Sequence, residues 1–187
     1  MYKLQSLISK KSILKIVLAI CILVLISGVS YETWKILNDK EKKADLDSTA
    51  HWKTYRNEKY GFEVKYPGDW SYKELGQMDS VTIDRVDFSF NGSINLTIEV
   101  LRDSLGGQLE KLPYAVESAK KANIEINGVP SVKITGIIGY SVQRPIVHIL
   151  TPKSSDSICD ISYYSDMNAE TIQNIERIIS TFKSFPQ

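Results

Sequence analysis

Residues 52–70 read WKTYRNEKYGFEVKYPGDW, and this stretch decides the fold of the chain. Apolar side chains occupy every second position of its central part, at Tyr60, Phe62, Val64 and Tyr66. Successive side chains of a β-strand point to opposite faces, so this spacing predicts a strand with one aromatic face. Pro67 ends the strand because proline has no N–H to donate, and the Gly-Asp pair that follows predicts a turn. We expect that turn to bury Trp70 against the aromatic face, although an exposed Trp70 in a binding surface is the alternative.

Further strands are expected where apolar residues alternate between turn residues. Their ranges are 81–90, 94–100, 124–126, 129–138, 142–151 and 157–164. Asn91-Gly92 is a dipeptide typical of two-residue hairpin turns. The apolar spacing shifts near Asp84-Arg85, which predicts a turn or a bulge in the first of these strands. Most of these ranges are separated by only a few residues, and short connections predict mostly antiparallel pairing.

Two segments have helical spacing. Gly106-Gly107 interrupts the strand pattern, and Pro113 fits only the first turn of a helix, so we predict a helix from about 113 to 122. A second helix closes the chain, with Asp166 or Asn168 as its N-cap. Its apolar face contains Ile172, Ile175, Ile179 and Phe182. The order strands, helix, strands, helix predicts an α+β fold.

The opening stretch contains the pattern Tyr-x-Asn-x-x-Tyr-Gly-Phe-x-Val-x-Tyr-Pro-x-x-Trp, which resembles the start of PsbP-like proteins. The matching positions are Tyr60, Gly61, Phe62, Tyr66, Pro67 and Trp70. The closing residues 178–182 also resemble the terminal helix of that family. The resemblance implies an α/β/α sandwich, an antiparallel sheet with helices on both faces, over residues 52–185. It also implies a non-catalytic, accessory style of function. The photosynthetic members are soluble lumenal proteins without an obvious anchor like the one predicted below, which argues against a photosystem role.

The N-terminal segment predicts a membrane anchor. Residues 13–31 are 19 in number, mostly apolar and uncharged except for Lys15, and their length matches that of a transmembrane helix. Tyr31 and Trp34 fit an aromatic belt. Three lysines precede the segment and Lys15 lies near its start, with no acidic residue among residues 1–31. We therefore predict a cytoplasmic tail at 1–12 and a C-terminal domain outside the cytoplasm.

This interpretation divides the chain into that tail, the anchor at 13–31, a polar stalk at 32–50 and an extracytoplasmic domain at 51–187. A cleaved signal peptide is the first alternative, because Gly28 and Ser30 have the spacing of a cleavage site. Lipidation of Cys21 is the second, and the bulky Ile20 before it disfavours that reading.

Charge and cysteine content exclude several classes of protein. The net charge is +1 for the whole chain, and residues 35–187 carry 19 basic and 21 acidic residues. A nucleic-acid-binding protein is expected to be clearly basic, so we expect no nucleic-acid partner. Two cysteines cannot form a disulfide scaffold.

The sequence identifies no catalytic, cofactor-binding or metal-binding residue. His51 lies at the edge of the stalk and His148 inside a strand, where a structural role is the simpler interpretation. Cys159 shares a strand face with apolar residues, and Ser141 lacks the second glycine of a nucleophile elbow. The sequons at Asn91 and Asn95 are interpreted as turn and strand residues.

The acidic pairs Asp84/Asp87 and Asp45/Asp47 are dispersed along the chain, and a weak site for a hard cation stays open. Three functions are therefore carried forward. The first is a membrane-anchored, non-catalytic domain that binds a protein partner or serves as an assembly factor. The second is an envelope hydrolase with an unrecognised site, and the third is a domain that senses an ion or ligand.

Overall fold

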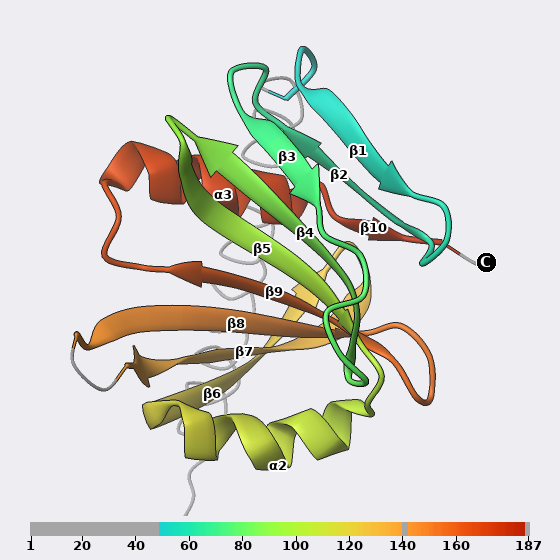
Figure 1. Ribbon diagram of the computed structural model, residues 1–187, viewed down its shortest axis with the longest axis vertical. Helices are drawn as coiled ribbons and strands as arrows, with labels where there is room; N and C mark the ends of the chain where they lie inside the picture. The colour runs from blue at the N-terminus through green and yellow to red at the C-terminus, as the bar shows by residue number, and fades with distance from the viewer. Residues whose placement is uncertain (1–48, 140–141, 186–187) are drawn as a thin grey trace, which may run out of the picture. The chain divides into compact units, whose positions relative to one another are not determined.

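The computed structural model describes residues 49–139 and 142–185 (Figure 1). They belong to one compact unit, Thr49–Gln187. The predicted tail at 1–12, the anchor at 13–31 and nearly all of the stalk lie outside the described residues. Within the two described ranges, no helix has the length and apolar character needed to span a membrane.

Two antiparallel sheets and two helices make up the described part. The larger sheet has seven strands there, in the order β3-β4-β5-β9-β8-β7-β6. Their bounds are β3 Ser71–Glu74, β4 Thr82–Phe90, β5 Ser93–Leu101, β6 Glu117–Ile126, β7 Val129–Ile138, β8 Arg144–Pro152 and β9 Ile158–Tyr164. The smaller sheet contains β1 Lys53–Asn57, β2 Phe62–Tyr66 and β10 Lys183–Ser184, and the helices are α2 Leu105–Ala115 and α3 Ala169–Ser180.

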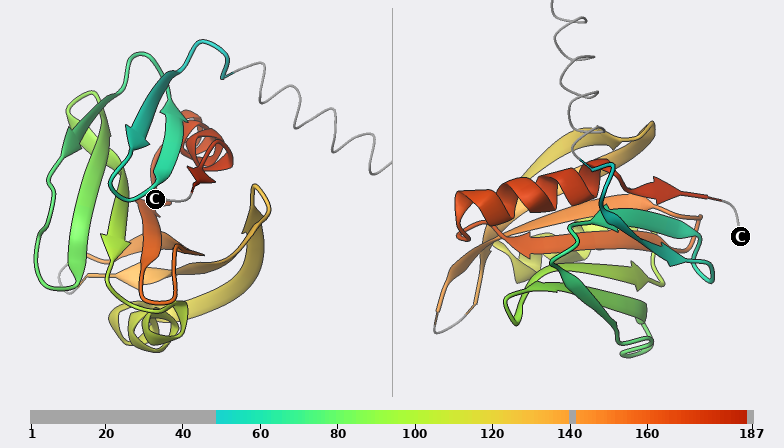
Figure 2. Two further views of the ribbon diagram at one scale, coloured as in Figure 1. Left: turned by 90° about the vertical axis from the view of Figure 1, so that its right-hand side faces the viewer. Right: turned by 90° about the horizontal axis from the view of Figure 1, so that it is seen from above.

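The two helices lie on opposite faces of the larger sheet. Two consecutive residues of β8 point to opposite faces, since Ile149 belongs to the core beneath α3 and Leu150 to the core beneath α2. Figure 2 shows the larger sheet curving around α3 and the smaller sheet, with α2 on the other side. We call the side of α3 the inner face and the side of α2 the outer face. The expected antiparallel sheet with a helix on each face is present, and the additional small sheet shares the inner face with α3.

The predicted helix over 113–122 is wrong. Ser104 caps α2 by accepting a hydrogen bond from Gly107 N, so the two glycines lie in the first helical turn instead of interrupting it. Pro113 lies in the last turn, where it cannot donate to the carbonyl of Leu109. Lys121 Nζ, 2.8 Å away, donates to that carbonyl instead. Residues 117–126 form β6, so Pro113 lies in the last turn of a helix and not, as predicted, in its first.

The opening stretch folds largely as expected. Phe62, Val64 and Tyr66 are buried on one side of β2, whereas Tyr60 lies in the turn before the strand. Trp70 is 2% exposed and stacks on Phe90, with ring centroids 6.0 Å apart. Its burial confirms the structural interpretation of this tryptophan.

The hairpins and the terminal helix also agree with the sequence pattern. Asn91-Gly92 joins β4 to β5 with positive φ at both residues. The register of β4 shifts between Thr82 and Asp84, close to the predicted irregularity. Asn168 is the N-cap of α3 and accepts from Thr171 N, whereas Asp166 forms an ion pair with Arg144.

Candidate functional site

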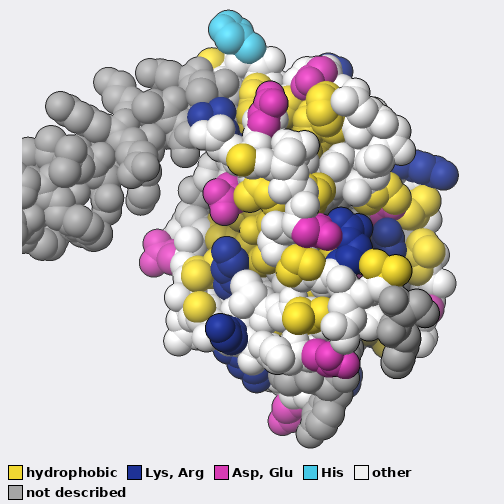
Figure 3. All heavy atoms as spheres, turned by 90° about the vertical axis from the view of Figure 1, so that its left-hand side faces the viewer, with side chains coloured by type: hydrophobic (Ala, Val, Ile, Leu, Met, Phe, Trp, Pro, Cys, Tyr) yellow, Lys and Arg dark blue, Asp and Glu magenta, His cyan; other side chains and the backbone are white. Residues whose placement is uncertain are grey.

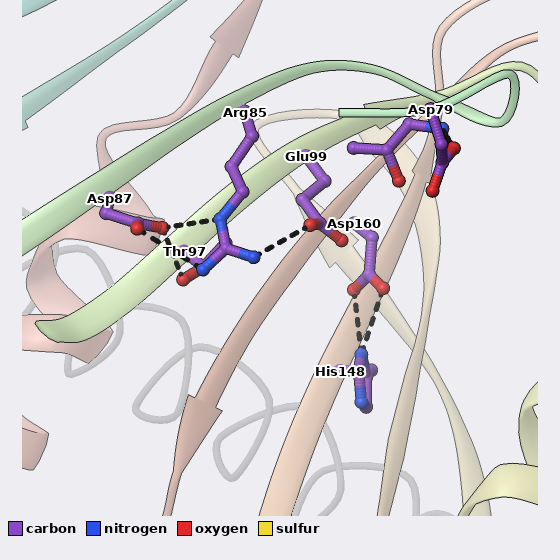
Figure 4. Close-up of polar contacts among 8 residues, drawn as sticks. Asp79, Arg85, Asp87, Thr97, Glu99, His148 and Asp160 are labelled. Atoms are coloured by element: carbon purple, nitrogen blue, oxygen red, sulfur yellow. Dashed lines mark hydrogen bonds and ion pairs between the residues drawn. The ribbon is translucent and has the colours of Figure 1, made fainter. Parts of the chain in front are cut away.

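A group of polar side chains crosses the outer face of four adjacent strands, β4, β5, β9 and β8. We call it the polar cluster; it consists of Arg85, Asp87, Thr97, Glu99, His148 and Asp160 (Figure 4). The strand register brings these residues together, because Arg85 lies opposite Glu99 and Glu99 lies opposite Asp160. The intervening residues of β4, β5 and β9 face inward and form the core with α3. The cluster therefore exists because alternate residues of buried strands are polar.

One half of the cluster is built around Arg85. Its Nε and Nη2 donate to the two carboxylate oxygens of Asp87 at 2.9 and 3.2 Å, and Nη1 donates to Glu99 at 3.4 Å. The hydroxyl of Thr97 adds a hydrogen bond to Asp87 at 2.9 Å. Asp87 is buried, and its bidentate contact with a guanidinium compensates the loss of water. This half is an internally satisfied ion pair.

The other half is the pair His148 and Asp160. Nδ1 of His148 lies 2.9 and 3.1 Å from the two oxygens of the buried Asp160 carboxylate. Burial lowers the pKa of His148, but the hydrogen bond to Asp160 and the charges of Asp160 and Glu99 outweigh it and raise the pKa above its usual value. Nε2 is buried and has no hydrogen-bond partner among the described residues. A substrate therefore cannot reach the free nitrogen of this ring in the structure.

Glu99 lies between the two halves. Burial and the charge of Asp160 opposite it raise the pKa of Glu99, while Arg85 and His148 act in the other direction. Two carboxylates that face each other across neighbouring strands repel when both are ionised. The cluster therefore favours a proton on Glu99 or on His148.

Other residues singled out in the sequence do not join this cluster. Cys159 faces inward, is fully buried, and burial raises the pKa of its thiol to about 12. His51 is exposed in a turn. Ser141 and the pair Asp45/Asp47 lie outside the described residues.

The acidic pair Asp84/Asp87 is split between the two faces of the sheet. Asp84 faces inward and accepts from Asn57 Nδ2 at 2.6 Å, whereas Asp87 belongs to the polar cluster. The two carboxylates therefore cannot share a cation. Across the residues that the structure describes, no group of three or more His, Cys, Asp or Glu side chains is arranged to hold a metal ion.

The two sequon asparagines are structural. Asn91 has a φ of 51° in the β4–β5 turn. Asn95 accepts a hydrogen bond from Phe90 N at 2.9 Å, and its amide nitrogen lies 3.3 Å from Met167 Sδ. These contacts agree with their interpretation as turn and strand residues.

Part of the exposed apolar surface lies at the edge of the larger sheet that β3 forms. In the described part of the chain, the exposed large hydrophobic residues are Tyr72 (45%), Val81 (41%), Met78 (53%), Ile94 (56%) and Val142 (73%). The first three fall within residues 71–81, which comprise β3 and the connection to β4, and which we call the β3 rim. β3 is an edge strand that pairs with β4 on one side, and all four of its residues are exposed. The β3 rim thus combines apolar side chains with an open backbone edge.

Figure 3 shows one face of the molecule, on which the described acidic and basic side chains are interspersed. A small hollow of about 350 Å³ lies beside the β6–β7 turn. It is lined by Asn127, Val129, Phe182, Lys183 and Ser184.

Comparison with solved structures gives three similar chains. The chain is similar to cyanobacterial PsbP (CyanoP) from Synechocystis sp. PCC 6803, with 13% identity, 73% of this chain and 94% of that chain covered, and a TM-score of 0.47. It is also similar to a Bacteroides thetaiotaomicron protein, with 13% identity, 73% and 49% coverage, and a TM-score of 0.49. A third similar structure is protein PA94 of unknown function from Pseudomonas aeruginosa, with 11% identity, 74% and 100% coverage, and a TM-score of 0.40.

The first of these is a PsbP protein, and the opening stretch resembles proteins of that kind. At 11–13% identity these similarities have no bearing on activity or partners. Neither a family model nor a curated protein matches the chain.

The polar cluster was not predicted from the sequence. Its members are polar residues at alternate positions of four strands, and that alternation was visible. Their proximity depends on β9 pairing with both β5 and β8, which no local pattern reveals.

Proposed function

We propose that the protein is a membrane-anchored, non-catalytic domain of the cell envelope that binds another protein as an accessory or assembly factor. The observation that carries this proposal is the β3 rim. Exposed apolar side chains along an unpaired strand are typical of interaction sites, because such a strand can accept a strand from another chain. Tyr72, Met78 and Val81 supply the apolar contacts, and the outer edge of β3 supplies backbone donors and acceptors.

The chemistry of the buried groups supports binding over catalysis. The Cys159 thiol is kept protonated by burial, and Nε2 of His148 is enclosed. The carboxylates of Asp87 and Asp160 are held by Arg85 and His148 respectively. These groups stabilise the sheet in a way that leaves them poorly placed to act on a substrate.

The membrane part of the proposal rests on residues 13–31 of the sequence. Protease added to intact cells should digest the chain beyond about residue 35 and leave the lysine-rich tail protected. Digestion of the tail with protection of the domain would reverse the orientation. A mature N-terminus at Tyr31 would show that the segment is a cleaved signal peptide.

Site-specific photo-crosslinking tests the binding surface. A photoreactive phenylalanine derivative is placed at Met78 in the full-length protein, and a matched chain carries it at Ile94, which is equally exposed on β5. We expect a defined heavier adduct from the Met78 position in native membranes and little from the control. Equal labelling at both positions would remove the β3 rim from the proposal.

Two other functions stay distinguishable by simple measurements. A hydrolase would show turnover with the purified protein that disappears in His148→Asn. A sensor of ions or ligands would show a melting temperature that rises with the ligand concentration. The polar cluster is the feature that would carry either function.

A further inference from the structure

The strand at the far end of the larger sheet from β3 is also open. β6 is last in the strand order, pairs with β7 on one side, and is ten residues long. Nine of these residues are exposed or half-buried, and Ile126 at the end is buried. Figure 2 shows β6 as the rim of the curved sheet. An edge of this length presents a row of backbone donors and acceptors to any matching strand.

The turn that follows β6 identifies which backbone groups are free. Asn127 and Gly128 both have positive φ and form a two-residue hairpin turn, so Ile126 and Val129 are the first hydrogen-bonded pair. Hydrogen-bonded and non-hydrogen-bonded pairs alternate along an antiparallel ladder. The N–H and C=O groups of Lys121, Asn123 and Glu125 therefore point away from β7, toward the open edge.

Side-chain charge along this edge is complementary to itself. If two copies of β6 pair antiparallel with Asn123 opposite Asn123, Lys121 of each copy lies opposite Glu125 of the other. The same register places Ala122 opposite Ile124 on the inner face. Moving the axis to Lys121 or to Glu125 would put like charges opposite each other, which destabilises strand pairing.

We propose that β6 is a homodimer interface, in which two copies of this chain pair antiparallel about Asn123 and join their seven-stranded sheets across the interface. The three edge-facing residues of each copy would form about six main-chain hydrogen bonds. Two Lys121–Glu125 ion pairs set the register on the outer face.

Edge lysines also serve to prevent pairing, and that is the competing explanation. Lys121 Nζ already donates to the carbonyl of Leu109 at 2.8 Å, and an ammonium group keeps two further protons for a carboxylate. A strand protected by charge repels every copy of itself. β6 instead places an acidic residue, Glu125, at the position that faces Lys121 in the hydrogen-bonded register.

Cysteine crosslinking in the full-length protein tests the register. Asn123→Cys is made in a Cys21→Ala background, and Lys73→Cys on the exposed β3 is the matched control. After mild oxidation in membranes, we expect a disulfide-linked dimer from Asn123→Cys and at least about tenfold less from the control. Lys121→Cys should crosslink poorly with itself but well with a co-expressed Glu125→Cys chain. Equal dimer yields at 73 and 123, or a crosslink from 123 to a chain of different mass, would overturn the proposal.

Charge reversal gives an independent test of the same interface. Glu125→Lys places two lysines opposite each other in each pair, and Lys121→Glu does the same with acids. Each variant should reduce the Asn123→Cys dimer by about tenfold, and co-expression of the two should restore it as a heterodimer. Restoration also shows that both variants fold. If neither reversal changes the yield of the Asn123→Cys dimer, β6 does not form the interface.

Discussion

Nδ1 of His148 lies 2.9 Å from Asp160 Oδ2, while Nε2 of the same ring is buried without a hydrogen-bond partner among the described residues. The ring is thus held on one side by a buried carboxylate and enclosed on the other. This pair connects β8 to β9 on the outer face, and Glu99 of β5 lies next to Asp160. Protonation of the cluster is therefore linked to the stability of the sheet.

The first prediction concerns pH. Because the folded state raises the pKa of His148 above 6.5, the stabilisation from the charged ring is fully present below pH 6.5 and is lost as the pH rises through the folded pKa. Glu99 acts in the same direction, since its pKa is raised as well. Melting temperatures measured between about pH 5.5 and 8.5 should show that His148→Asn lowers the melting temperature most at the acidic end. A decrease in melting temperature that becomes larger as the pH rises would contradict this linkage.

The second prediction concerns Trp70. Its indole is buried and stacked on Phe90, so Trp70→Ala leaves a large cavity. We expect a loss of about 3–5 kcal/mol in the free energy of unfolding. Urea unfolding of the purified protein measures it, with Ile94→Ala as a control expected within about 0.5 kcal/mol of the native protein. Native-like unfolding of Trp70→Ala with loss of partner binding would make this residue part of a binding surface.

The third prediction compares two glycines. A Cβ at Gly136 would collide with Val116 Cγ1 and with the carbonyl oxygen of Glu117, where α2 passes into β6. Gly136→Ala should therefore lower stability by about 1–3 kcal/mol. Gly68 has no atom near its Cβ position, so Gly68→Ala should leave the unfolding curve nearly unchanged. Similar unfolding curves for the two variants would show that the chain around Val116 shifts readily to make room for the added methyl group.

The fourth prediction concerns the thiol of Cys159. Burial raises its pKa to about 12, so the reactive thiolate is scarce and the sulfur is inaccessible. In a Cys21→Ala background, a thiol reagent at neutral pH should label the native protein at least about a hundredfold more slowly than the protein in denaturant. Rapid labelling of the native state would show that the sheet opens at β9.

Several elements could be predicted because local chemistry determines them. The alternation that ends at Pro67 predicted β2, Asn91-Gly92 predicted a hairpin, and the apolar stripe ending at Phe182 predicted α3. α2 was misplaced because Pro113 was assigned to a first turn, where proline is best tolerated. The hydrogen bond that makes Pro113 acceptable in the last turn comes from Lys121, which lies on the following strand.

The sequence by itself determined which residues of each strand face the core, since that depends on a two-residue period within the strand. It did not determine which strands are neighbours. The polar cluster exists because β9 lies between β5 and β8, and the open edges exist because β3 and β6 are the two end strands of the order. Strand order is decided by pairing between segments far apart in the chain and by burial of two cores at once. These contacts are made only when the whole domain is assembled, so no stretch of sequence encodes them locally.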